Sequence, residues 1–194
     1  MSPAPTPAPH ASSHDGAGPA AARRMTHPGP ADGPRRQHLA QPSRPALRFS
    51  LRPGVALQDG LLQAARRTQA PCAAFSLLAG GFARVRYWTA GPDAEGGRVA
   101  TYVGETTLAA PQRLVCGAGT IGTGLDGAPL IHCHAAFADA NGALAGGHLV
   151  PIDAVIGWEG LQGLLWGFDA IALSQRDDAE TGHSIFKPEE RTAP

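Results

Sequence analysis

A short segment near residue 140 predicts a β-hairpin and constrains the fold more than any other feature of the chain. Asn141-Gly142 is a strong two-residue turn signal between two apolar runs. His132 and His134 precede the turn and are two residues apart, so on a strand their side chains project from the same face. His148 follows the turn and returns a third imidazole to the same neighbourhood.

The register of this hairpin decides whether the three imidazoles share a face, because a one-residue slip turns every side chain over. With a simple two-residue turn, His148 would lie opposite Ala135, on the wrong face. One extra residue places it opposite His134, either through a bulge at Gly146-Gly147 or through a three-residue loop at 140–142. The metal hypothesis below therefore predicts a hairpin that is not perfectly regular.

Three neutral imidazoles that converge on one point, with a fourth position open, suit a divalent ion of the zinc type. We therefore predict a metal site at His132, His134 and His148, with zinc preferred although Mn, Fe, Co and Ni also accept imidazole. The alternative is three ordinary surface or core histidines. Catalytic residues are unknown. Glu159 could orient a ligand histidine or act as a general base, but the simpler interpretation is a solvated strand residue.

Charge argues against nucleic acid as a direct partner. The 16 basic and 16 acidic residues cancel over the whole chain. The segment up to Pro45 holds five Arg and only two Asp, so the remainder carries a surplus of acidic residues. Nucleic acid is bound mainly through Lys and Arg that neutralise phosphates. A mildly acidic domain is a poor match for that role.

The cysteines indicate the compartment. Cys72, Cys116 and Cys133 are odd in number and widely spaced, without a C-x-x-C pair, which predicts buried free thiols in a reducing environment. No apolar run approaches the roughly 18 residues of a membrane span, and no apolar leader segment follows the N-terminus. We expect a cytoplasmic protein that does not associate with membranes.

Composition divides the chain into three parts. Residues 1–43 are rich in Pro, Ala and Arg, holding nine of the 18 prolines and no Phe, Trp or Tyr. Such a segment cannot bury enough apolar surface to offset its ordering entropy, so it is predicted to be disordered. Within it, Met25 is a candidate for the true start. Residues 44–186 form the predicted domain, and residues 187–194 a C-terminal tail.

The domain is predicted to be α+β, with a strongly curved, largely antiparallel sheet and one or two helices. A strand at 46–52 and a helix at 55–68 come first, and two strands separated by Gly80-Gly81 follow. The second half is almost entirely strand, punctuated by Gly and Pro. The strands expected there are 98–103, 112–121, 130–138, 143–150, 155–159 and 164–172.

Together these motifs resemble the plant and prokaryote conserved (PPC) domain, whose bacterial members have long been described as of unknown function. The resemblance rests on F-S-L-R-P-G before a helix, a small-residue strand with Gly-Gly and, above all, H-C-H-A-A-F-A-D-A-N-G-A-L-A-G-G-H-L. It covers about residues 46–186, and M-T-H-P-G-P and D-A-E-T-G-H-S-I-F-K-P are similar to the flanks of a proteobacterial branch. It implies a homotrimer whose bacterial members hold a divalent metal, commonly zinc, here on His132, His134 and His148.

The function we favour is that of a metal-binding trimeric module whose metal site binds a small ligand or holds the oligomer together for a regulatory or interaction role. One alternative is a zinc-dependent enzyme acting on a small carbonyl or phosphoryl substrate. The other is DNA association, which plant relatives achieve through AT-hooks with an R-G-R-P core. This chain offers only Arg35-Arg36 and Ser43-Arg44-Pro45, so DNA binding is disfavoured. His183 falls where the related branch more often has Asn, so we do not count it as a ligand.

Overall fold

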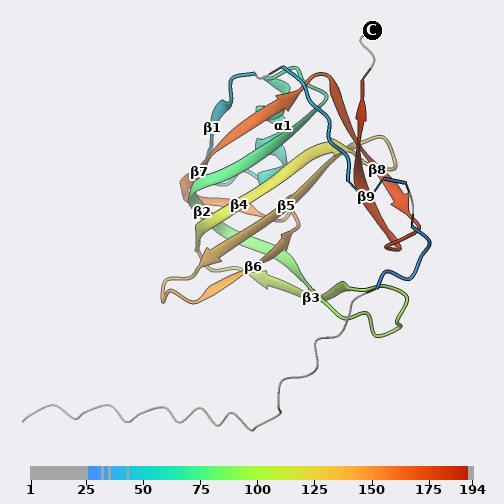
Figure 1. The fold of residues 1–194 in the computed structure, drawn as a ribbon. Coiled ribbons are helices and arrows are strands. Elements are labelled where there is room, and N and C mark those ends of the chain that lie inside the picture. The colour runs from blue at the N-terminus through green and yellow to red at the C-terminus, as the bar shows by residue number, and fades with distance from the viewer. Residues whose placement is uncertain (1–25, 32, 35, 43, 192–194) are drawn as a thin grey trace, which may run out of the picture.

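The computed structural model describes residues 26–31, 33–34, 36–42 and 44–191. Within these residues, nine strands and one short helix form a single sheet-based unit in which antiparallel pairing predominates (Figure 1). This confirms the coarse class predicted from the sequence. The elements are β1 (Leu47–Leu51), α1 (Leu57–Arg66), β2 (Cys72–Gly91), β3 (Thr101–Leu108), β4 (Gln112–Thr123), β5 (Pro129–Ala138), β6 (Leu144–Leu149), β7 (Val155–Phe168), β8 (Ile171–Asp178) and β9 (His183–Glu190).

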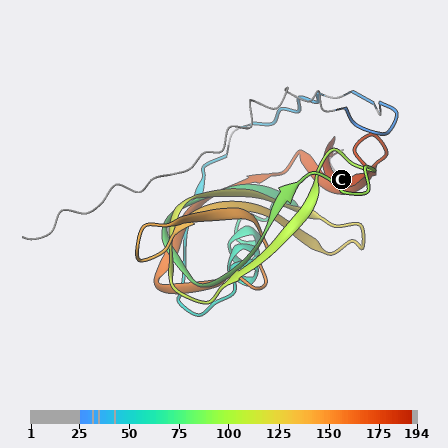
Figure 2. The same cartoon turned by 90° about the horizontal axis from the view of Figure 1, so that it is seen from below.

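Strand pairing forms a ring that contains the predicted histidine hairpin (Figure 2). β2 pairs with β4 through residues 73–82 and with β6 at Tyr87 and Trp88. β5 closes the ring because it pairs with both β4 and β6. β7 pairs with the other edge of β2 and carries β1, while β3 pairs with the last part of β2. A sheet whose pairing returns to its first strand has to bend.

β2 runs without interruption through Gly80-Gly81, where the sequence predicted two strands. Its register against β7 shifts three times between Leu77 and Arg84. Gly80 has φ +107°, a conformation that glycine adopts readily, and a Cβ there would collide with the carbonyl oxygen of Gly160. The glycines therefore bend the strand instead of ending it, and the prediction of two strands was wrong.

The strands predicted from the sequence also differ from the observed ones in the C-terminal region. The strand predicted at 155–159 and most of the one at 164–172 are joined in β7, and β8 follows. β9 was not predicted, yet it pairs with β8 along its whole length, from Ile171–Glu190 to Asp178–His183. The tail expected from residue 187 thus begins inside a strand. Alternating apolar residues are sparse in β9, which explains why its pattern gave no signal.

One apolar core joins α1 to the inner face of the sheet. Leu57 and Leu61 are fully buried on the helix, which is shorter than the predicted 55–68. On the sheet, the Phe137 ring packs edge-on against Phe82 and Tyr87, with centroids 6.2 and 5.4 Å apart. These contacts fix the inner face of β5 and so determine which of its residues face outward. No helix in the described part of the chain has the length and apolarity needed to span a bilayer.

The described part of the N-terminal segment makes ordered contacts with the domain. The Gln41 side chain donates a hydrogen bond to the carbonyl of Gly167 and accepts hydrogen bonds from the backbone N–H groups of Asp169 and Ala170. The backbone N–H of Gly29 donates to the Glu180 carbonyl. These hydrogen bonds connect Gly29 and Gln41 to the C-terminal part of the domain. Residues 1–25, including Met25, lie outside the described residues.

The three cysteines are free, but only two are buried as predicted. Burial raises the pKa of the Cys133 thiol to about 12, so this thiol stays protonated and unreactive at neutral pH. Cys116 is exposed because a bulge between Leu114 and Cys116 turns consecutive residues of β4 outward. The expectation of three buried thiols was therefore wrong for Cys116.

Candidate metal centre

The β5–β6 hairpin places His148 directly opposite His134. The sequence left two alternatives for this register, a three-residue loop and a β-bulge. The structure has the three-residue loop at 140–142 and no bulge at Gly146-Gly147, where the ladder continues without a register shift. These glycines allow close strand approach instead, since a Cβ on Gly147 would collide with the carbonyl oxygen of Trp88. β6 therefore fits tightly between β5 and β2.

Asp139 holds the loop that sets this register. Its backbone N–H donates to the carbonyl of Ala143. Its carboxylate oxygen Oδ1 accepts hydrogen bonds from the backbone N–H of Asn141 at 2.8 Å and of Ala143 at 2.9 Å. Asp commonly stabilises turns in this way. The side chain is therefore engaged in the turn and not at the histidines.

The alternation of β5 turns His132 and His134 outward while Cys133, between them, is buried in the core. Nε2 of His134 lies 3.1 Å from Nε2 of His132 and 3.3 Å from Nδ1 of His148. One nitrogen from each ring lies within 4.8 Å of the other two. Two nitrogens bound at about 2.05 Å to a tetrahedral zinc ion would lie about 3.3 Å apart. The donor set thus fits a divalent ion, and the three predicted residues are brought together.

The surroundings favour neutral imidazoles. Burial, and then the nearby His132 and His134, lowers the pKa of His148 from 6.5 to about 4. Burial, and then His134, also lowers the pKa of His132. Both rings are therefore neutral at pH 7 and offer a lone pair, the form in which imidazole binds metal ions.

Sequence reasoning missed Tyr102 on β3, a side chain from outside the hairpin that contacts His148. Its hydroxyl oxygen lies 3.2 Å from Nδ1 of His148, and the two ring centroids are 5.0 Å apart. The Trp88 ring lies beside Tyr102, with centroids 6.1 Å apart. No local motif connects Tyr102 to the histidines. It reaches them only because β2 pairs with both β3 and β6.

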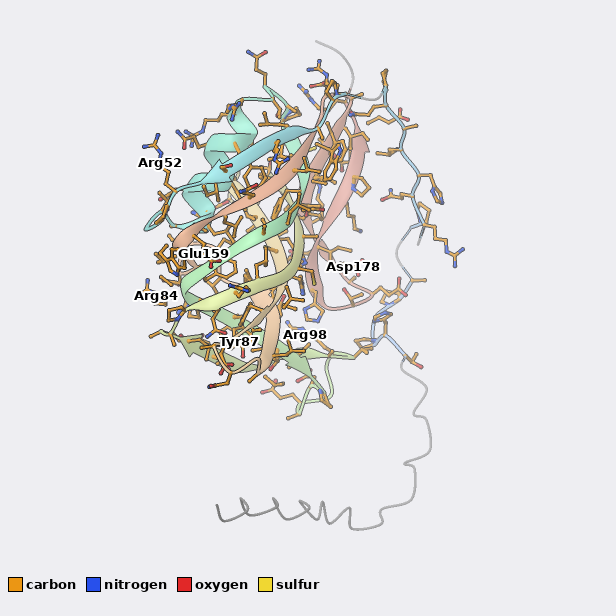
Figure 3. All side chains as sticks on the ribbon, turned by 90° about the vertical axis from the view of Figure 1, so that its left-hand side faces the viewer. Arg52, Arg84, Tyr87, Arg98, Glu159 and Asp178 are labelled. Atoms are coloured by element: carbon orange, nitrogen blue, oxygen red, sulfur yellow. The ribbon has the colours of Figure 1, made fainter. Side chains whose placement is uncertain are left out.

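Glu159 and His183 lie outside the histidine cluster. Glu159 on β7, labelled in Figure 3, pairs with Arg113, whose Nη2 is 3.5 Å from Oε1. With Trp158 it lines a cavity of about 540 Å³. Nε2 of His183 donates a hydrogen bond to the carbonyl of Ala100 at 2.9 Å. Among the described residues, the three histidines form the one group with metal-ligand spacing, and no carboxylate is part of it.

The chain matches the profile of the Plants and Prokaryotes Conserved (PCC) domain over residues 42–157. It therefore belongs to this family, the one that the hairpin motif indicated. A search of curated proteins found no match to the chain.

Solved structures with a similar fold come from both bacteria and archaea. A hypothetical protein from Salmonella cholerae-suis is 22% identical with a TM-score of 0.63, over 80% of this chain and 100% of that one. A metal-containing protein from Archaeoglobus fulgidus is 18% identical with a TM-score of 0.62, over 78% and 99%. A PPC protein from Pyrococcus horikoshii is 15% identical with a TM-score of 0.60, over 77% and 96%. At these identities the likeness concerns the fold.

Proposed function

We propose that this chain is a PPC-family module that binds a divalent metal ion, preferably zinc, through His132, His134 and His148. The observation that carries the proposal is the convergence of three ring nitrogens at 3.1 and 3.3 Å, close to the edge of a tetrahedral zinc site. The metal-containing relative from Archaeoglobus fulgidus gives further support. The bound ion leaves one position for a small ligand, which suits a ligand-binding or regulatory role.

Binding is favoured over catalysis by the groups near the histidines. Metal-assisted hydrolysis needs a general base beside the bound water. Among the described residues, no carboxylate joins the cluster, and Glu159 is paired with Arg113. DNA association stays disfavoured because the domain carries more acidic than basic residues. The free thiols support a reducing, cytoplasmic compartment.

We further propose that the module assembles as a homotrimer. Trp158 is 79% exposed and Leu144 is 74% exposed, which is unusual for large apolar side chains. Trp158 lines the cavity of about 540 Å³, and Leu144 is the strand partner of Ala138, which is another residue of the cavity lining. Exposed Trp beside a hollow is typical of protein interfaces. A second copy of the chain is the partner that the family resemblance implies.

Metal analysis of the purified full-length chain tests the central proposal. We expect one zinc ion per chain in the wild type, and His134→Ala should weaken zinc affinity by roughly 100-fold or more, because it removes a direct ligand. His183→Ala is the matched control, since this histidine lies outside the cluster. Competition with a chromogenic chelator gives the affinities. Equal zinc binding by the wild type and His134→Ala would contradict the proposal.

A further inference from the structure

The Tyr102 hydroxyl lies close enough to the histidines to contact a ligand bound to the proposed metal ion. Its hydroxyl oxygen is 3.2 Å from Nδ1 of His148, about one ligand-to-ligand spacing in a tetrahedral site. This is the same separation as that between the histidine nitrogens themselves. The hydroxyl therefore contacts the same His148 nitrogen that lies 3.3 Å from Nε2 of His134.

Metal binding has to redirect this hydroxyl. Without metal, Tyr102 and Nδ1 of His148 share a hydrogen bond. Nδ1 has a single lone pair when it is not protonated, and a bound ion takes that pair. The tyrosine O–H then loses its partner on the ring and can donate a hydrogen bond to another acceptor.

The charge of the site selects an anion for the remaining ligand position. Zinc held by three neutral imidazoles keeps both of its positive charges. No carboxylate belongs to the cluster among the described residues. Glu105 lies opposite Trp88 in the β2–β3 ladder, but its carboxylate is 3.6 Å from Arg86 and forms an ion pair with that side chain. An exogenous anionic oxygen therefore neutralises the centre better than a neutral ligand does.

We propose that the centre binds small oxyanions, of the carboxylate, bicarbonate or phosphate class. One oxygen of the anion coordinates the metal, and the Tyr102 hydroxyl donates a hydrogen bond to an oxygen of the same anion. The tilted rings of Trp88 and Tyr102 form an aromatic wall on this side of the centre. This inference rests on the proposed metal site and assigns Tyr102 the role of an anion-binding residue.

The test uses the full-length chain loaded with Co²⁺, whose visible absorption reports ligands at the metal. Acetate, bicarbonate and phosphate are titrated separately, which distinguishes the carboxylate from the inorganic sources. Tyr102→Phe should weaken the binding of the preferred anion roughly 10-fold, the loss expected for one hydrogen bond to a charged acceptor, with Co²⁺ stoichiometry unchanged. Tyr87→Phe, the same chemical change in the buried core, is the control and should not alter anion binding.

The outcomes separate this inference from the proposed function. A wild-type chain that takes up no metal rules out both. Normal metal uptake with equal anion affinities in wild type and Tyr102→Phe overturns the oxyanion site but leaves the metal site intact. A phenolate-to-metal charge-transfer band in the Cu²⁺-loaded wild type without added anion, absent from Tyr102→Phe, would show that tyrosine itself is the fourth ligand. That result also overturns the inference.

Discussion

At the scale of single residues, His148 couples protonation to the stability of the metal-free protein. Its pKa of about 4 in the fold lies below the value of 6.5 for a free imidazole. The unfolded chain therefore binds a proton at pH values where the folded chain does not. The stabilising contribution is complete above pH 6.5 and is lost as the pH falls from 6.5 towards 4.

Chemical denaturation of the metal-free chain across this pH range measures the effect. His148→Asn should reduce the dependence of the unfolding free energy on pH, because it removes a group with different pKa values in the two states. His38→Asn, at an exposed histidine far from the cluster in sequence, is the control. If both variants keep the wild-type slope, His148 does not titrate as described.

At the scale of elements, the hairpin depends on Asp139 for its register. Asp139→Ala removes the acceptor of two backbone N–H groups, so we expect a loss of about 1–2 kcal/mol in the free energy of unfolding. Asp139→Asn retains an oxygen at the same position and should recover most of this loss. Zinc affinity should follow the same order, since the loop places His148 opposite His134. A destabilised variant with unchanged zinc affinity would separate the loop from the metal centre.

The elements also show how far local patterns reach. The hairpin and the shared face of His132 and His134 followed from alternation and turn chemistry, because these act between neighbours in the sequence. The three-residue loop was only one of two alternatives that the sequence left open. The continuity of β2 through Gly80 did not follow. A glycine that ends a strand and one that bends it look the same in the sequence, and only the closeness of Gly160 distinguishes them. Tyr102 was missed for the same reason, since its partner lies on another strand.

At the scale of the whole molecule, Trp158 is the residue on which the proposed trimer is most easily tested. Light scattering after size exclusion should give about three times the 19.9 kDa of one chain. Trp158→Glu places a charge in the interface and should shift the mass towards that of a monomer. Leu125→Glu alters another exposed apolar residue, outside the cavity, and should leave the trimer intact. A monomeric wild type would rule out the assembly.

All three proposed ligands lie in one hairpin, and this affects how the chain folds. Hairpins form within about 1–10 μs, much faster than sheets that join distant segments. A cation can therefore gather these rings before β1 and β7, which pair although they lie more than 100 residues apart in the sequence, have met. Early capture would lower the kinetic barrier to folding and would leave the unfolding rate little changed, because the metal contacts would already be present in the transition state. The supply of metal ions during synthesis would then affect how quickly a newly synthesised chain folds out of partly folded states that aggregate.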